Sequence, residues 1–251
     1  SKIYRQNIDT RIIAITGSCG KTTLKELIGN SLKQLSKVSI SPKSYNNKYG
    51  VPLSLFNLNP KDNYGVLEIG MDKKGEIDYL SKIVKPDVSV ITNISYAHIK
   101  NFKSIRQIAL AKAEIINNTK DNGFVILNAD DNFFSMHKKI AIKRNLKILS
   151  FGIKNKNSNI KLINIKKRAK KYKATIKVNN IKTHFSLKND FQNNILNILS
   201  TLTVMSIYLD ISKIDKNIFY NFKIPNGRGD ISKIRVKNKL LNLIDESYNS
   251  N

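Results

Sequence analysis

Residues 11–23 have the sequence R-I-I-A-I-T-G-S-C-G-K-T-T, and this stretch decides the fold. Its first half, residues 11–16, is a short apolar run rich in β-branched residues that ends at Gly17, which is typical of a buried parallel strand. Beyond the turn, apolar residues recur at helical spacing over residues 22–35. A strand, a glycine-rich turn and a helix in this order predict an α/β protein.

The rest of the chain extends this alternation. Further strands are predicted at residues 64–69, 88–93, 124–128 and 146–151, and helices at residues 76–84 and 105–116. This order predicts a mostly parallel sheet flanked by helices. Alternating strands then follow at residues 160–165, 172–178 and 181–187, which predict a small antiparallel β insert at about residues 153–190. A helix within 193–209 and two strands within 231–244 are predicted last.

Composition excludes several classes of protein. Hydrophobic residues make up 41% of the 251 residues and charged residues 25%, which are ordinary values for a globular chain. No apolar run reaches the roughly 18 residues that a membrane span needs. The single cysteine, Cys19, excludes an internal disulfide, and no secretory signal follows Ser1. We therefore expect a cytoplasmic protein.

The net charge of +26 is large. Such a charge is typical of proteins that bind nucleic acids or anionic membranes. However, 37 of the 44 basic residues are lysines in a chain also rich in Ile and Asn, a bias that an AT-rich coding sequence produces without any partner. We expect no specific nucleic-acid partner. A basic nucleic-acid binder is kept as an alternative, and its binding would depend steeply on salt.

The turn at residues 17–23 predicts a phosphate-binding site. Successive backbone N–H groups and a helix N-terminus gather partial positive charge at one point. The Lys21 ammonium would neutralise the β and γ phosphates of a nucleotide, and the Thr22 hydroxyl would ligate Mg²⁺. The motif is a shortened P-loop, because Ile15 occupies the place of the usual first glycine. The predicted nucleotide-binding residues are Gly17, Ser18, Cys19, Gly20, Lys21, Thr22 and Thr23.

Two further residues, Glu68 and His98, are candidates from their positions alone. Glu68 interrupts the apolar strand V-L-E-I-G and needs a cation, either Mg²⁺ or a salt-bridge partner. His98 follows the strand predicted at residues 88–93, where ligands bind at the carboxyl ends of parallel strands, although a solvated loop histidine is equally compatible. Lys112 shares a helix with apolar residues, and its position alone favours an ordinary exposed lysine.

Together these segments resemble the Mur ligases. The matching segments are I-T-G-S-C-G-K-T-T (15–23), Y-N-N-K-Y-G-V-P (45–52), V-L-E-I-G (66–70), N-I-S-Y-A-H-I-K-N-F (93–102), A-K-A-E-I (111–115), N-A-D-D (128–131), N-I-L-N (194–197), N-G-R-G (226–229) and D-E-S-Y-N-S-N (245–251). They run in family order across nearly the whole chain. The last segment, with Y-N-N and G-V-P, most resembles members that join D-alanyl-D-alanine to UDP-N-acetylmuramoyl-tripeptide.

The resemblance implies an ATP-dependent amide ligase of peptidoglycan precursor synthesis. ATP would phosphorylate the peptide carboxylate, and the incoming amine would attack the acyl phosphate, with two Mg²⁺ and Lys21 offsetting the charge repulsion. The catalytic residues it implies are Lys21, Lys112 and His98. The metal ligands it implies are Thr22, Glu68, His98 and, if carbamylated, Lys112. For ATP it implies Asn194 and Asn197 at the adenine, Arg228 at a phosphate and Asp245 at the ribose, and for the UDP-linked substrate Asn46 and Asn47.

The sequence departs from the family pattern in two respects. Phe191, Gln192 and Asn193 stand where the family has Gly and His, which bears on nucleotide affinity and selectivity. The resemblance also leads us to expect that the family's N-terminal UDP-binding domain and C-terminal domain are absent from these 251 residues. We therefore expect residues 1–251 to be the central ATP-binding domain, monomeric and inactive alone. Alternatives are a sister Mur ligase, a folylpolyglutamate-synthase-like ligase, or a non-catalytic nucleotide-binding remnant.

Overall fold

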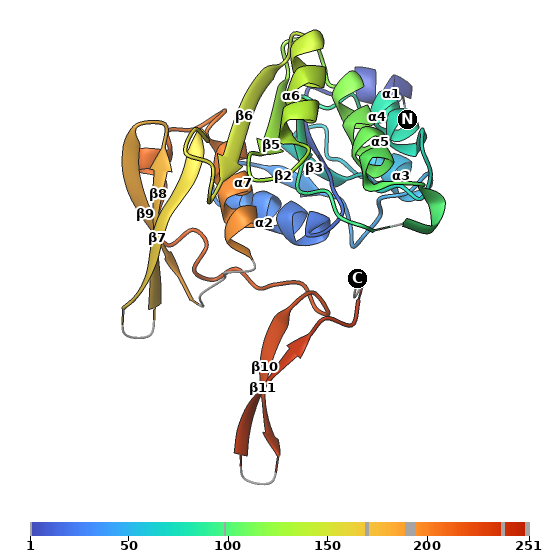
Figure 1. The fold of residues 1–251 in the computed structure, drawn as a ribbon. Coiled ribbons are helices and arrows are strands. Elements are labelled where there is room, and N and C mark those ends of the chain that lie inside the picture. Colours follow the sequence, from blue (N-terminus) through green and yellow to red (C-terminus); the bar gives the residue numbers. More distant parts are fainter. Residues whose placement is uncertain (1, 98, 169–170, 189–193, 237–238, 249–251) are drawn as a thin grey trace.

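A nine-stranded sheet organises the molecule (Figure 1). The computed structural model describes residues 2–97, 99–168, 171–188, 194–236 and 239–248. The parallel strands are β1 (Arg11–Thr16), β2 (Val38–Ile40), β3 (Tyr64–Glu68), β4 (Val88–Ile91), β5 (Phe124–Asn128) and β6 (Lys147–Gly152). They lie in the order β2-β3-β1-β4-β5-β6, so β1 is flanked by β3 and β4. The predicted mostly parallel α/β sheet is confirmed.

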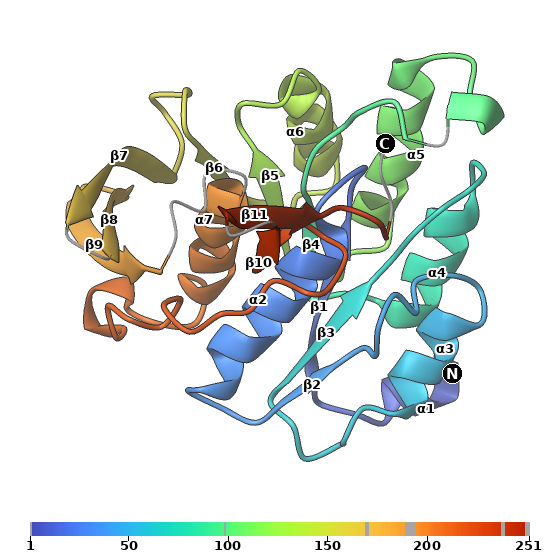
Figure 2. The ribbon, with the colours of Figure 1, turned by 90° about the horizontal axis from the view of Figure 1, so that it is seen from below.

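The antiparallel region is also confirmed, and it continues the main sheet. Its strands are β7 (Ile160–Arg168), β8 (Lys171–Val178) and β9 (Ile181–Leu187). β7 pairs in parallel with β6 through Phe151↔Ile160 and Gly152↔Lys161, and β8 and β9 follow as antiparallel neighbours. Figures 1 and 2 show these strands at one end of the sheet. The region is thus an extension of the sheet and not a separate flap.

Helices cover both faces of the sheet. They are α1 (Lys2–Gln6), α2 (Lys21–Lys33), α3 (Gly50–Phe56), α4 (Glu76–Val84), α5 (Ile105–Asn117), α6 (Phe134–Lys143) and α7 (Ile195–Met205). Helices α2 and α7 pack side by side on one face, and α3 to α6 lie on the other (Figure 2). Ile13 and Ile15 of β1 face the first core, whereas Ile12 and Ala14 face the second. Because both faces are buried, β1 is apolar throughout.

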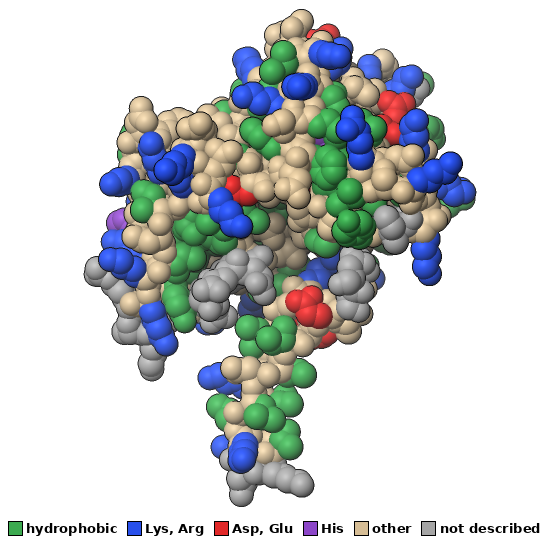
Figure 3. All heavy atoms as spheres, viewed as in Figure 1, with side chains coloured by type: hydrophobic (Ala, Val, Ile, Leu, Met, Phe, Trp, Pro, Cys, Tyr) green, Lys and Arg blue, Asp and Glu red, His purple; other side chains and the backbone are tan. Residues whose placement is uncertain are grey.

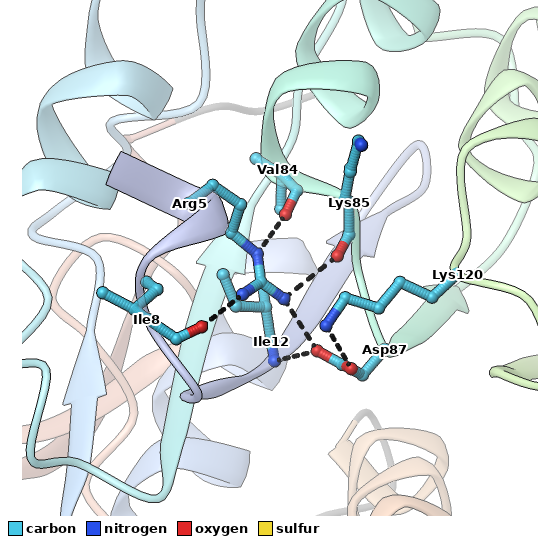
Figure 4. A network of polar contacts seen from close by, with 7 residues as sticks. All are labelled: Arg5, Ile8, Ile12, Val84, Lys85, Asp87 and Lys120. Carbon is cyan, nitrogen blue, oxygen red and sulfur yellow. Dashed lines mark hydrogen bonds and ion pairs between the residues drawn. The ribbon is translucent and has the colours of Figure 1, made fainter. Parts of the chain in front are cut away.

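A network of polar contacts joins α1 to the edge of the sheet opposite the phosphate-binding turn (Figure 4). The buried Arg5 guanidinium donates to the carboxylate of Asp87 at 3.0 Å. It also donates to three backbone carbonyls, those of Ile8, Val84 and Lys85. The Asp87 carboxylate in turn accepts from the Ile12 amide and pairs with Lys120, both at 2.8 Å. This network fixes the segment that enters β1.

A two-stranded hairpin projects from the main body (Figures 1 and 3). It consists of β10 (Asp230–Val236) and β11 (Lys239–Asp245), which pair antiparallel. These are the two strands predicted within residues 231–244. Its exposed apolar side chains are Ile231, Ile234, Val236, Leu240, Leu241, Leu243 and Ile244.

Among the helices of the described residues, none combines the length and apolarity needed to cross a bilayer.

Candidate functional site

The turn between β1 and α2 requires glycine at both of its bends. Gly17 has φ of 147°, and a Cβ placed there would lie 1.8 Å from the Thr92 side-chain oxygen. Gly20 has φ of 78° and is the N-cap of α2. The amides of the first helical turn, Lys21 to Thr23, have no intrahelical partner, and they form the positive end of the helix. The turn therefore has the form of an anion cradle.

Residues at the end of β4 hold this turn in place. The Ser18 amide donates to the backbone carbonyl of Asn93 at 2.9 Å, and the Cys19 amide donates to the Asn93 side-chain oxygen at 3.0 Å. The Thr92 hydroxyl donates to the Cys19 carbonyl at 2.8 Å. The Ser95 amide donates to the Ser18 hydroxyl, also at 2.8 Å. In this conformation the amides of residues 18 and 19 face Asn93, so the cradle is formed mainly by the start of α2.

Lys21 lies over the turn. Its Nζ donates to the carbonyls of Gly17 at 2.9 Å and Ser18 at 3.1 Å. Burial lowers the pKa of Lys21, and the nearby Glu68 carboxylate opposes that shift. The ammonium therefore occupies only weak backbone acceptors, which it can exchange for phosphate oxygens.

Glu68 meets Thr22 at the floor of the turn. β3 lies beside β1, with Glu68 opposite Ile15, and the Thr22 hydroxyl donates to Glu68 Oε2 at 2.6 Å. The other carboxylate oxygen, Oε1, accepts from the Asn46 side-chain amide at 2.7 Å. Glu68 is 2% exposed, and among the described residues no basic side chain is within ion-pair distance of it. A buried carboxylate without an ion pair beside a hydroxyl suits a hard divalent cation.

Lys112 is buried, and the alternative of an ordinary exposed lysine is wrong. It lies on α5 with 1% of its surface exposed, and it lines the same cavity as the turn. Burial and the nearby Lys21 ammonium lower the pKa of Lys112 to about 7. An uncharged amine is therefore well populated at neutral pH.

This shift predicts a pH dependence of stability. The pKa of Lys112 is about 7 in the folded chain and 10.5 ordinarily, so between these values the unfolded chain binds the extra proton. In wild-type protein the free energy of unfolding should rise from pH 7 to pH 9 relative to Lys112→Met, by roughly 1 kcal/mol per pH unit. Urea denaturation of both proteins at several pH values, in CO₂-free buffer, measures this difference in the free energy of unfolding. The exposed Lys103→Met is the control, and a difference between wild type and Lys112→Met that does not change with pH would contradict the assignment.

The predicted adenine and phosphate contacts lie around the same cavity. The side-chain amide of Asn197, on the first turn of α7, donates to the Asn194 side-chain oxygen at 3.2 Å. Asn197 also lies close to the phosphate turn, because a Cβ added to Gly20 would be 3.4 Å from the Asn197 side-chain oxygen. Arg228 donates to the Ser44 hydroxyl at 2.9 Å. Both asparagines and the arginine line the cavity.

Other predicted residues are placed differently. Asn46 and Asn47 also line the cavity. Asp245, at the end of β11, is not among the cavity residues, and its carboxylate accepts from the Ser247 amide at 2.9 Å. His98 and residues 191–193 lie outside the described residues.

The cavity has a volume of about 1720 Å³. Pockets for a single small molecule are usually about 300 to 1,000 Å³, so this one has room for two ligands. Its lining includes the turn, Lys112, and Asn194 and Asn197 at the start of α7. It also includes Asn46, Asn47, Lys48, Tyr49, Lys73 and Tyr79.

Comparison with known proteins identifies the family. The family model of the Mur ligase middle domain matches residues 15–205. The chain belongs to the Mur ligase family. It is 36% identical to the UDP-N-acetylmuramoyl-tripeptide–D-alanyl-D-alanine ligase of Buchnera aphidicola subsp. Baizongia pistaciae over 98% of this chain and 52% of that protein. It is 30% identical to the ligase of the same name from Escherichia coli K12, over 98% of this chain and 54% of that protein.

Solved Mur ligase structures have the same fold. A crystal structure of MurF from Acinetobacter baumannii superposes with a TM-score of 0.87 at 28% identity and covers 99% of this chain and 53% of that chain. MurF ligase from Thermotoga maritima in complex with ADP has a TM-score of 0.86 at 27% identity and covers 99% of this chain and 56% of that chain. This chain thus spans about half the length of the relatives it matches.

The residues of this Mur ligase chain fit a triphosphate chelated to Mg²⁺. The first amides of α2 and Lys21 suit phosphate oxygens, and Thr22 and Glu68 offer two oxygen ligands. Among the described residues no group of three or more His, Cys, Asp or Glu is arranged to hold a metal. A cation here would take its remaining ligands from phosphates and water, as Mg²⁺ usually does.

Sequence reasoning did not find several residues that shape the site. The role of Asn93 follows from β4 lying beside β1, which no local pattern reveals. Ser44 accepts hydrogen bonds from Arg228 and from the Tyr248 hydroxyl, each at 2.9 Å. Tyr248 also stacks against Arg228, with 4.0 Å from the guanidinium carbon to the ring centre. Ser44 lies next to the segment 45–52 and Tyr248 lies within the segment 245–251, both of which resemble the family. That resemblance was the one sequence feature that could have pointed to these two residues.

Proposed function

We propose that this chain is the central ATP-binding part of a ligase that joins D-alanyl-D-alanine to UDP-N-acetylmuramoyl-tripeptide, through an acyl phosphate and with loss of ADP and phosphate. The contact between Thr22 and Glu68 beneath the phosphate turn carries this proposal. The names of the relatives that match 98% of the chain support the choice of substrates. The protein acts as a cytoplasmic monomer in peptidoglycan precursor synthesis.

Each predicted residue has a role in this proposal. Lys21 and the first amides of α2 bind the β and γ phosphates, and Arg228 contacts a phosphate from the opposite side. Thr22, Glu68 and His98 hold Mg²⁺. Asn194 and Asn197 contact the adenine, and Asn46 and Asn47 contact the muramoyl substrate. Asp245 contacts the ribose in this proposal, and in this structure it lies between two residues that line the cavity, Ile244 and Glu246, without lining it itself.

ATP with Mg²⁺ supplies the phosphoryl group that activates the peptide carboxylate. The protein residues orient the reacting oxygens and stabilise the charge that collects between two anions. Lys21 lies where that charge develops, next to the turn held by Asn93. The first amides of α2 are already in place and need little reorganisation, whereas the Lys21 ammonium exchanges the Gly17 and Ser18 carbonyls for phosphate oxygens when the ligand binds.

Lys112 is the proposed site of carbamylation. Its pKa of about 7 leaves neutral amine available. The neutral amine nitrogen forms a bond to the carbon of CO₂ as one C–O π bond opens to give the carboxylate oxygen, and one proton is released to solvent. The neutral amine thus becomes a carbamate anion, and from the ammonium form two protons are released in all. A carbamate at this buried position would offset the Lys21 charge and supply an oxygen ligand to a second Mg²⁺.

Release of phosphate from ATP tests the proposed function. It is measured for the gene product that contains this chain, with UDP-N-acetylmuramoyl-tripeptide and D-alanyl-D-alanine together and singly. Release that needs both substrates is the expected result. Release that needs a different amino compound would identify a sister ligase, and failure to bind ATP would identify a remnant. The 251-residue chain alone should bind ATP and release no phosphate.

A further inference from the structure

Lys25 is a fully buried lysine that the proposed reaction does not use. It lies on α2 one helical turn after Lys21, with 0% of its surface exposed. Its ammonium donates to the backbone carbonyls of Ser41 and Lys43. It also pairs with Glu26 at 3.0 Å. An ammonium has three protons, so this buried cation is fully satisfied, as its burial requires.

The two carbonyls belong to a segment that lacks regular structure, residues 41–47, which we call the 41–47 loop. Lys43 has φ of 44°, a left-handed conformation that is unfavourable for a residue with a side chain. The loop is anchored to β3 at its start, where the Ser41 amide donates to the Val66 carbonyl at 2.9 Å. Between that anchor and α3, Lys25 is a charged group that holds the backbone of the loop, through the carbonyls of Ser41 and Lys43.

The loop presents side chains to three parts of the cavity. Asn46 donates to Glu68 at 2.7 Å, and Ser44 accepts from Arg228 at 2.9 Å. The Asn47 side-chain oxygen accepts from the Gly50 amide at 2.9 Å at the start of α3. A shift of this loop would therefore move the Asn46 amide that orients Glu68, and it would move the lining residues Ser44, Asn46 and Asn47.

We propose that Lys25 is a positioning residue that holds the 41–47 loop in the conformation that receives the muramoyl peptide. The first turn of α2 carries the proposed phosphate-binding amides and its second turn carries Lys25, so one helix links the phosphate turn to the 41–47 loop. This inference rests on the proposed function for the identity of the ligand. The structural part of the inference, that Lys25 stabilises the conformation of the 41–47 loop, does not depend on the proposed function.

The test replaces Lys25 with Met, which keeps the length of the side chain and removes the ammonium. Lys33→Met, an exposed position on the same helix, is the matched control. Amide hydrogen exchange is measured at residues 44–47, and affinities are measured for a nonhydrolysable ATP analogue and for UDP-N-acetylmuramoyl-tripeptide, all in the full gene product. Loss of charge-assisted hydrogen bonds should accelerate loop exchange and weaken peptide binding by about tenfold or more. Affinity for the ATP analogue, measured without Mg²⁺ so that Glu68 as a metal ligand does not contribute, should change less than about threefold.

The outcomes separate this inference from the proposed function. If the wild-type protein does not bind the muramoyl peptide, the proposed substrate is wrong, and loop exchange alone decides the role of Lys25. Unchanged exchange at residues 44–47 would overturn the inference. An equal loss of both affinities would indicate general stability only and would also overturn it. If Lys25→Met does not fold, Lys25→Gln is measured in the same way, and failure of both to fold counts against a positioning role.

Discussion

Replacing Lys21 with Ala is expected to weaken binding of a nonhydrolysable ATP analogue by about a hundredfold or more. Within the part of the chain that the structure describes, the Lys21 ammonium donates hydrogen bonds to the carbonyls of Gly17 and Ser18. Bound nucleotide would replace these neutral acceptors with phosphate oxygens, whose charge-assisted hydrogen bonds are the strongest available to it. Isothermal titration in the presence of Mg²⁺ measures the effect on the 251-residue chain.

A matched variant on the same helix distinguishes this site from general attraction. Lys33→Ala removes the same charge from an exposed position and should leave the affinity within about twofold, because surface charges are screened by salt. Binding that survives Lys21→Ala and falls steeply with salt would instead indicate nonspecific attraction of polyanions to a chain of net charge +26.

Replacing Arg5 with Met should lower the free energy of unfolding by about 3 kcal/mol. Arg5 and Asp87 form a pair with side chains 3% and 24% exposed, and removal of the guanidinium also leaves three backbone carbonyls without their donor. Asp87 keeps Lys120 and the Ile12 amide, which limits the loss (Figure 4). Urea denaturation at pH 7 measures the change.

Arg106→Met is the control for this prediction, because Arg106 is exposed on α5 and the same substitution there should change stability by less than about 0.5 kcal/mol. A similar small change in Arg5→Met would show that the network contributes little. Nucleotide affinity should be unaffected by Arg5→Met in folded protein, since the network lies at the opposite edge of the sheet from the phosphate turn.

The central strand and the phosphate turn were predictable from the sequence because their signals are local. Residues 11–16 form β1 as predicted, and α2 begins within one residue of its predicted start. Glu68 was identified as a candidate metal ligand because a carboxylate within an apolar strand needs a cationic partner. These features depend on short-range patterns that tertiary structure did not override.

Other features depend on contacts between distant segments. The continuation of the sheet into β7 rests on two residue pairs with β6, which no periodicity reveals. β2 has three residues, and α3 has seven with Pro52 in its first turn, so neither has a clear period. Burial of Lys112 could not be predicted, because one lysine among 37 has no distinguishing local pattern.

The placement of Asp245 illustrates the limit of the resemblance. Its assignment to the ribose depends on where the hairpin of β10 and β11 lies relative to the cavity. In this structure the hairpin projects from the main body, and only residues near its base line the cavity (Figure 1). Nucleotide contact by Asp245 stays a prediction.

The central claim is that the turn after β1 binds a metal-chelated triphosphate with Glu68 at the metal. The most direct measurement is the affinity for the ATP analogue with and without Mg²⁺ in wild-type protein and in Glu68→Gln, which keeps the size of the side chain and removes its charge. Mg²⁺ should strengthen binding by about tenfold or more in wild type and by much less in Glu68→Gln. An equal effect of Mg²⁺ on both proteins would contradict the account.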